Sequence, residues 1–203
     1  MKHFNIEIRD NEYLTRENYL QKIIFEDVKE KESYLAWYDK HIQFFNDLST
    51  EEFNFQIEKL LKKFKDFKQI TNLNDCDFSG IYIMVLDKHK QLYIGVSKNI
   101  KKRIKQHWSK NVKLDYLSNW LNNFPIGIDC FKALDTTRIY VSNYNDLINY
   151  VNLILENLKE KPYKQNEIYF LMEDDEAKMI KLINKKFLCN KYIRTKLQSI
   201  KRF

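Results

Sequence analysis

The sequence predicts a mixed α/β fold in which a β-hairpin is followed directly by an amphipathic helix. Two runs rich in β-branched and aromatic residues, at 81–86 and 92–96, are separated by a short polar segment. After the second run the spacing of apolar residues changes from two to about 3.6, which is the period of a helix. A helical spacing also precedes the hairpin, over residues 49–64, so we expect helices as well as strands.

Residues 1–75 are expected to form a helical N-terminal region, after a short strand near residues 4–8. Ser49 and Glu52 have the spacing of a capping box, and apolar residues follow at helical spacing: Phe53, Ile57, Leu60, Leu61 and Phe64. These side chains need a surface to cover. The region either packs over one side of the remaining fold or forms an arm for a substrate or a second protein, through which the chain could also form a homodimer.

The predicted hairpin places two tyrosines beside a glycine. If residues 87–90 form a four-residue loop, Tyr82 lies opposite Gly95 and Met84 lies opposite Tyr93. Tyr82 and Tyr93 then share one face as diagonal neighbours, close enough for both phenols to reach one small group. A glycine inside a strand typically marks a bulge or a close approach to the backbone. Gly95 therefore leaves a gap beside Tyr82.

The helix after the hairpin carries two polar residues beside its apolar stripe. Ile100, Ile104 and Trp108 are spaced as one buried face. Arg103 and His107 are also four residues apart, so they border that face and can point back toward the sheet. The remaining positions are basic, with Lys98, Lys101, Lys102 and Lys105. Two tyrosines, an arginine and a histidine therefore converge on one gap, with lysines around them.

Residues from about 109 to 165 are expected to form an enlarged middle section. Its pattern indicates a short helix over 111–124, strands at 128–131 and 139–141, and a long helix over about 144–159 that Asn143 caps. The section either shapes a substrate groove or adds cover to the core.

The last part of the chain places one acid on an apolar stripe. Residues 168–172 are expected to form a strand, with a helix from there to about residue 187. Glu176 continues the helix face made by Ile180, Ile183 and Phe187, so its carboxylate should point inward, where an acid normally needs a positive partner. Glu176 could otherwise cap the helix or pair with Arg103. The basic residues after 190 either extend a phosphate-binding rim or form a solvated tail.

Charge is unevenly distributed along the chain, which has a formal net charge of +7. Residues 1–75 contain 12 basic and 15 acidic residues, whereas residues 76–203 contain 23 and 13. A basic surface on the half with the hairpin is typical of a protein whose partner has a phosphate backbone. An AT-rich genome would also raise the lysine content.

Cysteine usage and hydropathy predict the compartment. Cys76, Cys130 and Cys189 are far apart and form no metal-binding motif, so we expect reduced thiols. No apolar run reaches about 18 residues, and the first residues lack the apolar segment of a signal peptide. We therefore expect a cytoplasmic protein with no membrane partner, divided near residues 72–79 into an N-terminal region (1–75) and a main domain (76–203).

The hairpin and its helix resemble the signature of the GIY-YIG nuclease superfamily. Gly80-Ile81-Tyr82 and Tyr93-Ile94-Gly95 stand on the two strands in the family's order, and Arg103 and His107 follow on the basic helix. The resemblance covers about residues 76–195. It implies a small three-stranded antiparallel sheet flanked by helices, with Gly80 and Gly95 as structural glycines.

The resemblance also implies roles for the site residues. A glutamate of the family binds a single divalent metal ion, which assigns Mg²⁺ or Mn²⁺ to Glu176. A site asparagine of the family matches Asn190, although the proline that often precedes it is missing here. Arg103 would clamp the phosphate in the transition state and Tyr82 would take a proton from water, with His107 as a rival base and Tyr93 as an orienting group. Lys98, Lys101, Lys102, Lys105 and Asn190 would contact nucleic acid.

We therefore expect a metal-dependent endonuclease that acts on DNA more readily than on RNA, of a restriction, defence or mobile-element type. Two other functions stay open. A non-catalytic nucleic-acid-binding module of the same fold would bind DNA and leave it intact. A protein-interaction factor would act through residues 1–75.

Overall fold

The main sheet of this protein is antiparallel. The computed structural model describes residues 2–8, 43–108, 116–117, 126–127 and 135–190. The strand order is β3-β8-β4-β5, formed by Lys68–Ile70, Arg138–Asn143, Gly80–Leu86 and Gln91–Ser97. The predicted antiparallel sheet flanked by helices is thus confirmed. The sheet has four strands instead of the expected three: β4 and β5 form the predicted hairpin, β8 contains the strand predicted at 139–141, and β3 lies at one edge.

The β4–β5 hairpin has the register that its loop length predicts. Tyr82 pairs with Gly95, and Met84 pairs with Tyr93. The connection is a short 3-10 turn closed by Lys90, which adopts the left-handed region at φ 51°. Every residue of β4 is buried, so other elements cover both faces of this strand.

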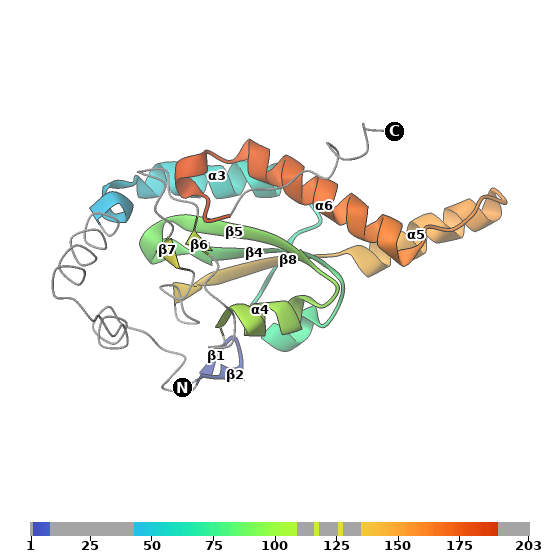
Figure 1. Ribbon diagram of the computed structural model, residues 1–203, viewed down its shortest axis with the longest axis horizontal. Coiled ribbons are helices and arrows are strands. Elements are labelled where there is room, and N and C mark those ends of the chain that lie inside the picture. Colours follow the sequence, from blue (N-terminus) through green and yellow to red (C-terminus); the bar gives the residue numbers. More distant parts are fainter. Residues whose placement is uncertain (1, 9–42, 109–115, 118–125, 128–134, 191–203) are drawn as a thin grey trace, which may run out of the picture.

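Helices lie on both sides of the sheet (Figure 1). α4 (Ile100–Trp108) follows β5 and lies on one side, while α3 (Thr50–Lys63) and α6 (Gln165–Leu182) lie on the other. α5 (Tyr144–Asn157) begins where β8 ends and, with the first half of α6, extends beyond the sheet as a helical hairpin. Asn143 caps α5 as predicted, because its side chain accepts a hydrogen bond from the Asn145 N–H.

Helix α3, which precedes residue 76, packs into the same hydrophobic core as the sheet. α3 buries Phe53, whose ring centroid lies 5.6 Å from that of Phe187. The Lys186 ammonium pairs with the Glu52 carboxylate at 2.6 Å, and Ser49 accepts the Glu52 N–H as the capping box predicts. α3 therefore covers the core, while the division of the chain near residues 72–79 stays a prediction.

The first residues form a two-stranded hairpin, and its second strand lies within the short strand predicted near residues 4–8. β1 (Lys2–His3) pairs with β2 (Ile6–Glu7) across Phe4 and Asn5, which both have positive φ. Such a two-residue turn reverses the chain, and a phenylalanine in it gives no sequence signal. Most of the helical pattern expected before residue 45 lies outside the described residues.

Residues 168–172 are helical, so the strand predicted there is wrong. They belong to α6, which runs unbroken from Gln165 to Leu182. A short apolar and aromatic run does not by itself distinguish a strand from a helix segment. The helix begins before this run, at Gln165, and its first turn is capped, because the Lys164 N–H donates to the Glu167 carboxylate at 2.7 Å. The helix also ends before the predicted residue 187, and Lys185–Phe187 form a separate 3-10 turn.

The middle section contains a second small hairpin. Tyr116–Leu117 (β6) pair with Ile126–Gly127 (β7), so the helix predicted over 111–124 is wrong at Tyr116–Leu117. Two-residue strands are too short to show a period. The rest of that helix, the strand at 128–131 and Cys130 lie outside the described residues. The strand at 139–141 is confirmed within β8, and the helix from residue 144 is confirmed as α5.

Cys76 and Cys189 are free and buried, as expected. Burial raises the pKa of the Cys76 thiol to about 12, which keeps it protonated and unreactive. Among the described helices, none is long and apolar enough to cross a membrane.

Candidate active site

The Tyr82 ring occupies the space that Gly95 leaves open. A Cβ atom at Gly95 would lie 2.6 Å from the Tyr82 Oη and 2.7 Å from its Cζ, closer than such contacts allow. Tyr82 is 0% exposed, so its ring has no room to move aside into solvent. The glycine is therefore required by the position of this phenol.

The residues before β4 fix the starts of two helices. The Phe78 carbonyl accepts the Ile100 N–H at the start of α4, and the Ser79 carbonyl accepts the Tyr144 N–H at the start of α5. At Gly80 a Cβ would lie 2.0 Å from the Ser142 carbonyl oxygen, so only glycine allows this approach of β4 to β8. α4 is thereby positioned with Arg103 and His107 next to the hairpin.

Tyr82 and His107 share one buried hydrogen bond. The Tyr82 Oη lies 2.8 Å from the His107 Nε2, and His107 is 2% exposed. Burial lowers the pKa of His107 to about 3, and the positive charge of Arg103 acts in the same direction. The imidazole is therefore neutral at pH 7 and can exchange a proton with the phenol. Its Nδ1 is buried without a hydrogen-bond partner among the described residues.

Arg103 and Tyr93 complete a cluster around this pair. The Tyr93 ring lies edge-on to the His107 ring, with centroids 4.8 Å apart, and its centroid lies 6.0 Å from that of Tyr82. Burial acts against the charge of Arg103, but the two phenols raise the pKa of its guanidinium. Burial raises the pKa of Tyr82 well above its usual value and Tyr93 adds to this, while Arg103 opposes it. The structure thus brings together all four predicted residues of the hairpin and α4.

Glu176 lies in the interior of α6, half-buried, on the side of the helix that carries Met172 and Met179. Burial raises the pKa of its carboxyl group to about 7, and the nearby Glu173 carboxylate contributes in the same direction. A position in the middle of a helix excludes the capping role that the sequence left open. Within the described part of the chain Glu176 forms no salt bridge, so it is not an ion-pair partner of Arg103.

The charges of both the α6 acids and Arg103 act on the Tyr169 phenol. Burial raises the pKa of the Tyr169 phenol, Glu173 and Glu176 raise it further, and Arg103 lowers it. One phenol therefore senses both the α6 acids and the α4 arginine. Tyr169 was not among the predicted site residues, because the apolar run at 168–172 suggested a strand. On a helix, Tyr169, Glu173 and Glu176 fall at i, i+4 and i+7, which would have put them on one face.

The α6 acids fit a hard divalent cation. A carboxylate whose pKa is raised by burial and by a second acid is stabilised as the anion when a cation binds. The described residues contain no group of three or more His, Cys, Asp or Glu side chains that could form a complete metal cage. Mg²⁺ is usually bound by one or two carboxylates, water and substrate phosphates. Glu176 and Glu173 would supply the carboxylates of such a ligand set.

The neighbouring Asp174 and Asp175 do not share this environment. Both pair with Lys178, at 2.7 Å and 2.8 Å, and Asp175 accepts a hydrogen bond from the Tyr144 hydroxyl at 2.5 Å. These two acids therefore tie α6 to the start of α5.

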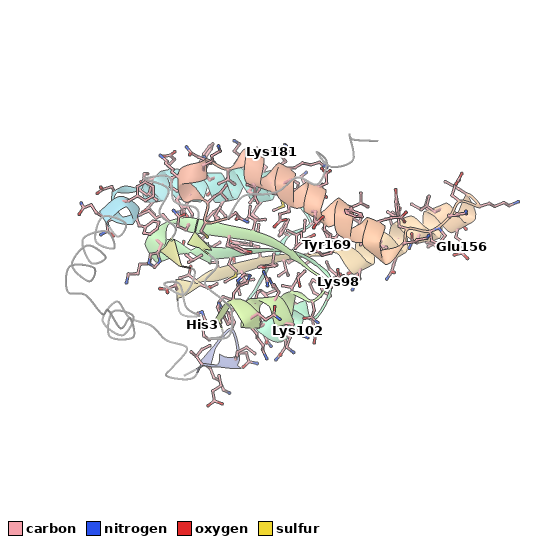
Figure 2. The ribbon with its side chains drawn as sticks, in the orientation of Figure 1. His3, Lys98, Lys102, Glu156, Tyr169 and Lys181 are labelled. Atoms are coloured by element: carbon pink, nitrogen blue, oxygen red, sulfur yellow. The ribbon has the colours of Figure 1, made fainter. Side chains whose placement is uncertain are left out.

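The lysines predicted to line the site do not lie together. Lys101, which pairs with Asp77 at 3.6 Å, and Lys105 are each two positions from Arg103, so α4 directs them to its opposite side. Figure 2 shows Lys102 on the side of α4 that faces away from the sheet, and Lys98 at the end of the sheet near Tyr169. Of the four, only Lys98 lies beside the α6 residues of the site.

Asn190 is used inside the protein. Its Oδ1 accepts the Ile94 N–H at 2.9 Å, and its Nδ2 donates to the Ile94 carbonyl. The side chain thus pairs with the edge of β5 between Tyr93 and Gly95. Beside it, the Cys189 N–H donates a hydrogen bond to the Leu92 carbonyl at 2.9 Å. In this structure Asn190 positions the strand that carries Tyr93, and contact with nucleic acid stays a prediction.

The comparisons with known proteins agree with this geometry. Residues 78–146 match the family described as the GIY-YIG catalytic domain, which includes β4, β5, α4 and β8. No curated protein and no solved structure matches the chain. The matched residues include Tyr82, Tyr93, Arg103 and His107 and end before Glu176.

Proposed function

We propose that this protein, whose residues 78–146 match the GIY-YIG catalytic domain, is a metal-dependent endonuclease that hydrolyses phosphodiester bonds in DNA. The observation that carries the proposal is the buried Tyr82–His107 hydrogen bond beside Arg103, in the gap that Gly95 leaves open. A structural hairpin would have no need of a neutral histidine, a charged guanidinium and two phenols at one point. We assign the enzyme to a restriction, defence or mobile-element system.

Arg103 supplies the permanent positive charge. Phosphodiester hydrolysis accumulates negative charge on the phosphate oxygens, and a preorganised guanidinium stabilises it with two parallel hydrogen bonds. The raised pKa of Arg103 keeps this charge at neutral pH. In our proposal Arg103 binds the scissile phosphate, and Tyr93 orients the phosphate or the attacking water.

Tyr82 and His107 handle the proton of the attacking water. The Tyr82 phenol is protonated at neutral pH because its pKa is raised, so it must release a proton before it can take one. The neutral imidazole at 2.8 Å can accept that proton on Nε2. The two side chains therefore act as one relay, in which either can be the group that faces the water.

Glu176, with Glu173 beside it, would hold Mg²⁺ or Mn²⁺, which when bound neutralises charge on the phosphate oxygens. The exposed Lys98, which lies beside the α6 residues of the site, would bind a phosphate next to the cut, and Lys102 and Lys105 on the outer side of α4 would bind phosphates farther from it. A monomer brings one such cluster to the DNA and cuts one strand in each event.

A cleavage assay tests the proposal. Supercoiled plasmid and single-stranded oligonucleotides are incubated with the protein in Mg²⁺, Mn²⁺ or EDTA, and wild type is compared with Arg103→Ala and Glu176→Gln. We expect metal-dependent cutting that each substitution lowers by at least about a hundredfold. Asp174→Ala is the matched control on α6, because Asp174 pairs with Lys178 and should leave cutting unchanged.

The outcomes separate the two functions of this fold. Full cutting by Glu176→Gln would remove Glu176 as the metal ligand. Salt-sensitive binding with no cutting of any substrate in either metal would identify a non-catalytic nucleic-acid-binding module instead. Nicked circles as the first product are expected from a monomer, whereas direct linearisation would indicate a dimer.

A further inference from the structure

A groove between α5 and α6 opens next to the candidate active site. Its volume is about 450 Å³, and it lies where the two helices pass the start of β4 and the end of β5. The polar residues that line it include Lys98, Asn145, Asn149, Asn152, Tyr163 and Tyr169, and no residue of the lining is acidic. This volume is in the range of pockets for small ligands and is too small to admit a duplex.

The asparagines form one polar stripe on α5. Asn145, Asn149 and Asn152 fall at i, i+4 and i+7 and so share a face of the helix. Asn152 holds the connection between the helices, because its Oδ1 accepts the Tyr163 N–H at 2.8 Å. The exposed side chains of Asn145 and Asn149 present an amide donor next to an acceptor, which is the arrangement that pairs with the edge of a nucleobase.

Two tyrosines border the same groove. Tyr163 is 42% exposed, and Tyr169 is half-buried. A phenol ring at the wall of a polar groove is a surface on which an unpaired base stacks without regard to its sequence. Together the amides and the phenols fit the polar edge and the flat face of one base.

The charges give the groove a direction. At one end Lys98 lies beside Tyr169, the phenol that senses both Arg103 and Glu176 (Figure 2). At the other end Asn149 and Asn152 also line a second hollow of about 520 Å³, whose charged lining residues are Glu156, Glu160 and Lys159. The charged lining of the first end is the cation Lys98, whereas two acids and one lysine line the second, so a phosphate is attracted more strongly to the first end. A nucleotide therefore enters with its phosphate at Lys98 and its base toward Asn149.

We propose that this groove binds one unpaired nucleotide next to the scissile phosphate, with its phosphate at Lys98 and its base between Asn149 and Tyr163. The inference rests on the proposed nuclease function and adds a substrate preference to it. Substrates that offer an unpaired nucleotide at the cut, in a single strand or at a junction, bind better than a fully paired duplex.

Binding without cleavage tests the groove separately from the chemistry. The background is the full chain with Glu176→Gln, and fluorescence anisotropy measures its affinity for a labelled single-stranded oligonucleotide and for a blunt duplex of the same sequence. In this background Asn149→Leu should weaken single-strand binding by about tenfold and change duplex binding less than twofold. Lys98→Ala removes a phosphate contact, so it should weaken the binding of both substrates. Asn157→Leu is the matched control, since Asn157 is an exposed residue of α5 outside the groove.

Each outcome decides the proposal. If Asn149→Leu weakened single-strand and duplex binding equally, or weakened neither, the nucleotide site would be overturned even if the enzyme cuts DNA. A tenfold selective loss supports the site even if the wild-type protein proves inactive as a nuclease. If Asn149→Leu unfolds the protein, Tyr163→Leu at the opposite wall replaces it, with the same selective loss expected.

Discussion

At Gly95 the absence of one Cβ atom determines where the Tyr82 phenol lies. Gly95→Ala would force the buried Tyr82 ring to shift, because the new Cβ would lie 2.6 Å from its Oη. We expect the free energy of unfolding to fall by about 1–3 kcal/mol and cleavage to fall at least about tenfold as the Tyr82–His107 hydrogen bond is lost. Urea unfolding and single-turnover cleavage measure the two effects.

A double variant separates packing from chemistry at the same position. Tyr82→Leu removes the ring that the new Cβ would meet, so Gly95→Ala should cost far less stability in that background than in wild type. Cleavage should stay lost in the double variant. Equal costs in both backgrounds would mean that Gly95 serves another purpose, such as contact with the substrate.

Protonation of His107 should couple stability to pH. Its folded-state pKa of about 3 lies below its ordinary value of 6.5, so the unfolded chain binds the proton more readily between these values. Stability is therefore complete above pH 6.5 and falls as the pH decreases toward 3. Between pH 7.5 and 5.5 we expect His107 alone to lower the free energy of unfolding by about 1.4 kcal/mol.

The comparison of His107→Gln with wild type measures that contribution. The variant should lose less stability than wild type between the two pH values, whatever its stability at pH 7.5. His89→Gln should behave alike, since burial also lowers the pKa of His89 to about 3. A His107→Gln protein with the pH dependence of wild type would show that His107 is not held neutral in the fold.

At the scale of elements, the segment after α6 holds the edge of β5. The Asn190 amide makes both of its hydrogen bonds with the backbone of Ile94. Asn190→Ala leaves these edge groups unpaired, so we expect a loss of about 1–3 kcal/mol. Amide hydrogen exchange should show faster exchange at Ile94 and little change at Ile83 on β4. Unchanged protection of Ile94 would contradict the positioning role and favour a direct contact with the substrate.

The elements differ in how far the sequence predicts them. The register of β4 and β5 followed from the four-residue loop and the alternation of side chains, so the Tyr82–Gly95 pair was predictable. The helical conformation of the Ile168–Met172 run was not predictable, because a few apolar residues occur equally in strands and helices. The wrong assignment also meant that Tyr169 was not recognised as a site residue. β3 has three residues of mixed polarity, too few for a pattern, and it is recognised only through its pairing with β8. The roles of Glu176 and Asn190 came from the family resemblance, and only the structure shows that Asn190 faces Ile94.

At the scale of the whole molecule, the uneven charge predicts a salt-dependent interaction with nucleic acid. Residues 76–203 contain 23 basic and 13 acidic residues, and Lys102 and Lys105 of α4 are exposed. We expect DNA affinity to fall at least about tenfold between 50 and 200 mM salt. The double variant Lys102→Ala/Lys105→Ala should lower the slope of log affinity against log salt by about two. An unchanged slope would show that this side of α4 does not face the DNA.

The central claim is that Glu176 of α6 and Arg103 of α4 serve one active site, and a double-mutant cycle tests it most directly. Single-turnover cleavage in Mn²⁺ is measured for wild type, Arg103→Lys, Glu176→Asp and the double variant, since conservative changes keep the rates measurable. When two residues act on the same phosphate, the rate loss of the double variant is smaller than the product of the two single losses. The double variant should therefore cleave only slightly more slowly than the slower single variant. Losses that multiply, or a Glu176→Asp enzyme as fast as wild type, would place the metal and the chemistry elsewhere in the protein.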